Sequence, residues 1–164
     1  VSYATILGSK LGKYHDAYEY GIVAKEICDR SNDITEKAKT YILFSGMVNH
    51  WVRPVDISIE LLHQALDAAM KSGLLTMIGN AITQIVYHSV RRSVNLQAIE
   101  RFYKNHKELL QNTKHEEALY TVECFYRLIR ALSGKTNAVS SFSDYAFRED
   151  DFVLVDVADR NEAR

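Results

Sequence analysis

The sequence predicts an all-α fold in which about four αα-hairpins stack as a solenoid. Apolar residues recur at intervals of three and four along most of the chain, which is the spacing of one buried helical face. Signals that end a helix recur as well, at Gly12, Pro54, Gly73 and Gly134. Ala17, Ser58 and Ala98 are small residues 41 and 40 positions apart, early in successive second helices, and a period near 40 is typical of helical repeats.

Hairpin one is expected over residues 1–32. Its first helix covers residues 2–11 and ends at Gly12, and its second helix runs from His15 to Asn32. The second helix carries a stripe of apolar and small residues that we expect to be buried: Ala17, Tyr20, Gly21, Ala24, Ile27 and Cys28.

Hairpin two, residues 33–73, has the clearest boundaries in the chain. Asp33 is the predicted N-cap of its first helix, and Glu36, three positions later, suggests a capping box. Pro54 is the only proline and fixes a corner after Trp51, because it lacks an amide hydrogen and disfavours helical geometry in the preceding residue. Asp56 is expected to cap the second helix, which Gly73 ends.

Hairpin three covers residues 74–113 and is followed by a terminal segment over residues 114–164. The helices of hairpin three are separated by a break at residues 92–95. The terminal segment contains a helix over residues 115–133, a Ser-rich loop, and a last element from Arg148 to about Asp159. We expect this last element to be a helix, although its alternating valines 153, 155 and 157 fit a strand equally well.

Composition limits the classes of function. The 164 residues suffice for one domain, and a net charge of -1 gives no general attraction to nucleic acid. No apolar run is long enough to span a bilayer, so no membrane contact is expected. The two cysteines, Cys28 and Cys124, are far apart in sequence, which favours a reducing cytoplasm over a disulfide-bonded protein. Because Val1 is not an initiator methionine, we expect a piece of a longer protein.

No catalytic, cofactor-binding or metal-binding residue is predicted. Gly134, Lys135 and Thr136 resemble the end of a phosphate-binding loop, but the required earlier glycine would fall at Ile129 inside a helix. Glu60 and His63 have metal-site spacing without a second copy of the pair, and no two histidines lie three or four positions apart.

The remaining candidate residues are expected to serve packing. His106 lies on an apolar stripe, Cys28 is expected to be a small buried group, and Cys124 has no recognisable neighbouring base. The tyrosines mostly fall on helical stripes, so we interpret them as packing groups and not as platforms for nucleic-acid bases.

A set of landmarks spans nearly the whole chain: Ala38, Tyr41, Phe44, His50, Trp51, Pro54, Tyr87, His88, Gly134, Thr136, Ser141, Phe142, Ser143, Asp144 and Phe147. In order and distance they resemble the tetratricopeptide-like helical region of large bacterial multidomain signalling proteins. Gly12, Tyr14, Ala17 and Ala24 also keep the tetratricopeptide spacing, although Gly21 stands where that pattern prefers an aromatic residue. The β-branched residues near Val155 depart from it too.

The resemblance implies a connecting and regulatory segment. In that family a Ser/Thr-kinase-like domain and an AAA- or STAND-type ATPase domain precede the helical region, and GAF, histidine kinase or other output domains follow it. The fragment itself is then not an enzyme, and its partners are neighbouring domains or a peptide, with self-association left open.

A partner site is predicted at Tyr87, Arg91 and Arg92, because the basic residues between Arg91 and Lys114 outnumber the acidic ones. We expect this surface to bind an acidic protein segment. The alternative is a STAND-type transcriptional regulator whose helical region binds a small inducer or self-associates.

Overall fold

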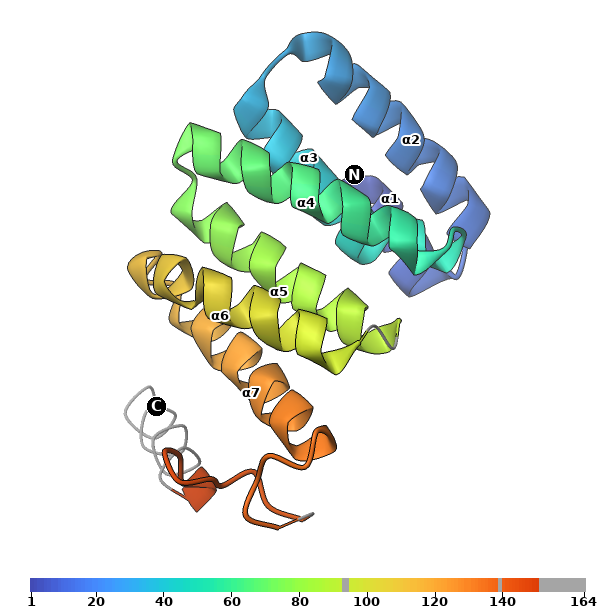
Figure 1. Ribbon diagram of the computed structural model, residues 1–164. Coiled ribbons are helices and arrows are strands. Elements are labelled where there is room, and N and C mark those ends of the chain that lie inside the picture. The colour runs from blue at the N-terminus through green and yellow to red at the C-terminus, as the bar shows by residue number, and fades with distance from the viewer. Residues whose placement is uncertain (93–94, 139, 151–164) are drawn as a thin grey trace, which may run out of the picture. The chain divides into compact units, whose positions relative to one another are not determined.

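Figure 1 shows the computed structural model, which describes residues 1–92, 95–138 and 140–150. Its elements are α1 (Ser2–Leu11), α2 (Tyr14–Ser31), α3 (Ile34–Met47), the 3₁₀ helix η1 (Asn49–Trp51), α4 (Val55–Ser72), α5 (Leu75–Arg91), α6 (Leu96–Asn112) and α7 (Glu116–Leu132). Within the described ranges the only β-structure is one isolated antiparallel bridge between Asp144 and Phe147. The predicted all-α class is therefore confirmed.

The chain divides into two compact units, residues 1–122 and 123–164, and α7 passes from the first into the second. The first unit contains α1 to α6. In it, α2, α4 and α6 end beside the hairpin boundaries expected at residues 32, 73 and 113. The predicted last element, from Arg148 to about Asp159, falls mostly outside the described residues.

The helices of the first unit pack in chain order. Each of α1 to α5 contacts the next helix, and α3 also contacts α1 and α5 (Figure 1). Helices α2 and α3 are in close contact at Gly21, where a Cβ atom would lie 2.6 Å from the ring of Phe44. Phe44 is 1% exposed, so this aromatic ring fills the space that the missing side chain leaves.

The start of α3 follows the sequence prediction in part. The Asp33 carboxylate accepts hydrogen bonds from the amides of Thr35 at 2.8 Å and Glu36 at 3.2 Å, which makes it the N-cap. The Glu36 side chain does not complete a capping box, because it pairs with Lys39 at 2.8 Å. At the other end of the hairpin Gly73 adopts φ 69°, the left-handed conformation expected of a helix stop.

The prediction that Asp56 caps α4 is wrong. Pro54 occupies the N-cap position and no side chain caps the helix, while Asp56 lies in the first turn and forms an ion pair with Arg92. An N-cap residue lies just outside the helix with non-helical backbone angles, as Pro54 does at φ -53° and ψ 140°, whereas Asp56 is already inside the first turn.

The predicted stripe of α2 is wrong in part. Ala17, Gly21 and Cys28 are buried, but Tyr20 and Ile27 are exposed, because α1, α3 and η1 pack on the side that carries the small residues. The three residues that define the predicted repeat also differ in burial. Ala17 and Ser58 are fully buried, whereas Ala98 of α6 is exposed.

Candidate functional site

Tyr87 and Arg91 form one surface feature on α5. The residues are four positions apart, which places them on the same side of the helix, and the Arg91 guanidinium lies 5.3 Å from the centre of the Tyr87 ring. Both side chains are exposed. This cation–π pair presents a positive charge and an aromatic face together, a combination that can bind carboxylates beside apolar groups.

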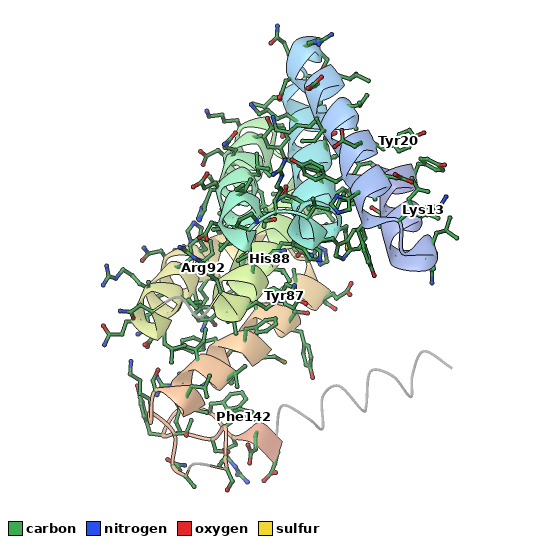
Figure 2. The ribbon with its side chains drawn as sticks, turned by 90° about the vertical axis from the view of Figure 1, so that its right-hand side faces the viewer. Lys13, Tyr20, Tyr87, His88, Arg92 and Phe142 are labelled. Carbon is green, nitrogen blue, oxygen red and sulfur yellow. The ribbon has the colours of Figure 1, made fainter. Side chains whose placement is uncertain are left out.

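Arg92, the third predicted partner residue, lies on a different side of α5. A helix turns about 100° per residue, so Arg92 is displaced by roughly 140° from Tyr87. Its guanidinium is paired with Asp56 of α4, and both side chains are about half exposed. The structure therefore joins Tyr87 with Arg91 and separates Arg92 from them, as Figure 2 also shows for Tyr87 and Arg92.

Arg92 instead borders a cavity of about 230 Å³ between α4, α5 and α6. The cavity is lined by Ile59, His63, Ile85, Ser89, Arg92, Ala98, Ile99 and Phe102. The His63 ring meets the Phe102 ring edge-on at 5.6 Å, and burial, with the neighbouring His106, lowers the His63 pKa. At neutral pH the cavity therefore combines an apolar lining with the Arg92 cation and the Ser89 hydroxyl.

Two histidines, the buried His88 and the half-buried His50, lie next to the Tyr87–Arg91 pair, since the Tyr87 and His88 rings are 5.3 Å apart. His88 is 0% exposed, its ring centre is 5.4 Å from that of His50, and neither of its ring nitrogens has a hydrogen-bond partner among the described residues. Burial first, and then His50 and Arg91, lower the pKa of His88 from 6.5 to about 4. The pKa of His50 is lowered too, by burial and by the Arg91 charge.

His88 and His50 were not among the residues predicted for the partner site. His88 follows Ile85 by three positions on the apolar side of α5, and that spacing is the signal that could have revealed its burial. The contact with His50 could not be found in the same way, because the two histidines are 38 positions apart in sequence.

The contact between α3 and α5 carries further polar atoms. Within the described ranges, Ser45 Oγ and Gln84 Oε1 are buried without a hydrogen-bond partner, and a Cβ atom at Gly46 would lie 3.0 Å from Cδ of Gln84. Buried polar atoms without partners cost free energy, so the contact between these two helices is less stable than an apolar one of equal area.

In the second unit, ion pairs connect Asp144, in the loop after α7, to the end of that helix. Asp144 is buried and pairs with Arg127 at 3.2 Å and with Arg130 at 2.8 Å, and the Arg127 guanidinium lies 3.8 Å from the centre of the Phe147 ring. The amide of Ala146 donates a hydrogen bond to the Asp144 carboxylate, and this bond is the largest of the effects that lower the Asp144 pKa. The positive charges of Arg130 and Arg127 lower it further.

The residues that resemble the end of a phosphate-binding loop form a helix stop. Gly134 ends α7 with φ 67°, and the amide of Lys135 donates to Arg130 O at 2.9 Å, as in a helix stop. In the part of the chain that the structure describes, no three His, Cys, Asp or Glu side chains gather where they could hold a metal ion. None of the described helices is both long and apolar enough to cross a membrane.

Comparison with known proteins gives no relatives. Neither a family model, nor a curated protein, nor a solved structure matches the chain significantly.

Proposed function

We propose that this chain is a non-catalytic, tetratricopeptide-like scaffold of four helix pairs that binds an acidic protein segment. The observation that carries the proposal is the exposed Tyr87–Arg91 pair on α5. An arginine held over an aromatic ring loses little side-chain freedom when it binds a carboxylate, and the ring adds apolar contact area beside the charge. Arginine and tyrosine are also the residues that contribute most to binding in protein interfaces.

The packing of the first helices supports the repeat architecture. α3 contacts α1 and α5, so the first helices of consecutive hairpins are neighbours. Gly46 of α3 lies against Gln84 of α5, and Gly79 of α5 lies against Ala118 of α7, where an added Cβ would be 3.1 Å away. This succession of close contacts is the arrangement by which helical repeats form a continuous binding surface.

The wider setting is part of the same proposal. The landmark residues resemble the helical region of multidomain bacterial signalling proteins, and we place the scaffold there, in the cytoplasm, between ATPase and output modules. A neighbouring domain or a peptide segment of such a protein would supply the acidic partner.

The partner prediction is tested with a labelled peptide rich in Glu and Asp that contains one aromatic residue. We expect Arg91→Glu to weaken binding at least about tenfold, which is about 1.4 kcal/mol, and Tyr87→Ala to weaken it severalfold. Fluorescence anisotropy measures both. Arg101→Glu, a charge reversal at an exposed residue of α6, is the matched control and should change little.

A second peptide in which Lys replaces each acidic residue controls for the sign of the charge. Equal binding of the two peptides, or an Arg91→Glu protein that binds like the original, would refute the assignment of this site.

The cavity beside Arg92 favours a second candidate function, a sensor region of a STAND-type regulator that binds a small inducer. Its lining suits a compact apolar molecule that carries one carboxylate. A thermal-shift screen of such carboxylates should then find a rise in Tm that Ala98→Phe, which fills the cavity, abolishes. If no compound raises the Tm, the inducer hypothesis fails.

A further inference from the structure

The outer side of α2 carries an unbroken stripe of exposed residues. Tyr20, Val23 and Ile27 are 53%, 52% and 64% exposed, although all three are large and apolar. Asp16 and Arg30, also exposed, extend the same line in the two directions. Figure 2 shows Tyr20 on this outer side of α2, away from His88.

The spacing of this stripe is that of a helix that pairs with another helix. From Asp16 to Arg30 the residues follow at intervals of four, three, four and three, the pattern by which two helices keep one seam in contact over several turns. Tyr3 of α1 adds to the apolar surface, because its ring meets Tyr20 edge-on at 5.1 Å and is itself exposed. Contiguous apolar surface of this kind marks a site of association.

The charges at the ends of the stripe identify the partner. Asp16 stands at the first turn of α2 and Arg30 at the last, so the stripe is acidic at one end and basic at the other. Two copies of α2 placed antiparallel about Val23 would bring Asp16 of each against Arg30 of the other. The dipoles of the two helices would then be antiparallel, so the positive end of each would lie near the negative end of the other, which is favourable.

The existing contacts of Arg30 leave this pairing open. Arg30 pairs with Glu26 at 3.9 Å, and both side chains are largely exposed. An exposed pair at that distance contributes little, so Arg30 can exchange it for a carboxylate on a second molecule.

We propose that a second copy of this chain packs on the stripe from Asp16 to Arg30 in an antiparallel, two-fold symmetric dimer. Such an interface is self-complementary, as two-fold dimers require, because each copy offers the same acidic and basic ends. It uses a different surface from the Tyr87–Arg91 pair, so the inference goes beyond the proposed function and can fail independently of it.

Charge exchange at the ends of the stripe tests the proposal with the full chain. Asp16→Arg alone places two arginines opposite each other at both ends, and Arg30→Asp alone places two aspartates there. Sedimentation equilibrium should show a dimer for the original chain and at least tenfold weaker association for each variant. An equimolar mixture of the two variants should regain the dimer, because each then supplies the charge that the other lacks.

Two further variants define the surface. Val23→Glu sets two carboxylates against each other at the symmetry axis and should give a monomer, whereas Leu75→Glu, at an exposed apolar residue of α5, should not. Circular dichroism of each variant confirms that the helices remain folded. A chain that is monomeric at about 100 μM, or a dimer that is indifferent to Val23→Glu and to the charge exchange, overturns the proposal.

Discussion

Replacing Phe44 with alanine is expected to lower the free energy of unfolding by about 3–5 kcal/mol. The ring is almost fully buried and lies in the contact between α2 and α3, against Gly21 and 5.9 Å from the ring of Tyr18. Its removal leaves a cavity that the two helices cannot fill without moving. Urea unfolding followed by circular dichroism measures the loss.

The adjacent Leu43 provides the matched control for Phe44. Leu43 is 39% exposed on the same helix, so Leu43→Ala should cost clearly less. If Phe44→Ala and Leu43→Ala lower the free energy of unfolding equally, burial of the Phe44 ring does not stabilise the contact between α2 and α3.

Gly21 tests the same contact from the opposite side. In the original chain Gly21→Ala forces a Cβ atom against the Phe44 ring and should cost about 1–3 kcal/mol by overpacking. In the Phe44→Ala background the space is free, so the added methyl should cost much less there. This non-additivity is the expected signature of two residues in direct contact.

The second large effect is a loss of stability in mild acid that originates at His88. Its pKa is about 4 in the folded chain against an ordinary value of 6.5, so between these values the unfolded chain binds more protons than the folded one. Stability therefore falls as the pH drops below 6.5, and the loss from this group reaches about 3 kcal/mol below pH 4. The lowered pKa of His50 acts in the same direction.

The physical reason is that burial and the neighbouring basic groups both disfavour a proton on His88. Of the titratable groups around it, the ones that act on its pKa are His50 of η1 and Arg91 of α5, and both are basic. Asp56 of α4 is engaged by Arg92.

A His88→Leu variant isolates this effect. Leucine keeps the burial but removes both the titration and the two unpartnered nitrogens, so the variant should lose less stability between pH 6.5 and 4.5 than the original chain. Urea titrations at several pH values give the profiles, and parallel curves for the original chain and His88→Leu would contradict the assignment.

The local features of the fold could be predicted from the sequence. The Asp33 cap, the corner at Pro54 and the stop at Gly73 depend on the backbone geometry of a few consecutive residues, and all three are found where they were expected. Asp56 is the exception, because α4 already begins at Val55 and Asp56 therefore lies inside the first turn, where it cannot be the N-cap.

The arrangement of the candidate site could not be predicted to the same extent. Sequence proximity predicted that Arg92 would share one surface with Tyr87 and Arg91. In the structure Arg92 instead pairs with Asp56, a residue of α4. The burial of His88 beside His50 likewise depends on how η1 meets α5.

The pattern of residues is sufficient to predict that this chain is helical, where most of its helices begin and end, and that each helix has an apolar face. Which of those faces are covered depends on the tertiary packing. The stripe of α2 shows the reason: Tyr20 and Ile27 have the same periodicity as buried residues, yet they are exposed because the neighbouring helices pack on Ala17 and Gly21 instead. Periodicity is a property of one helix, whereas burial depends on the positions of its neighbours.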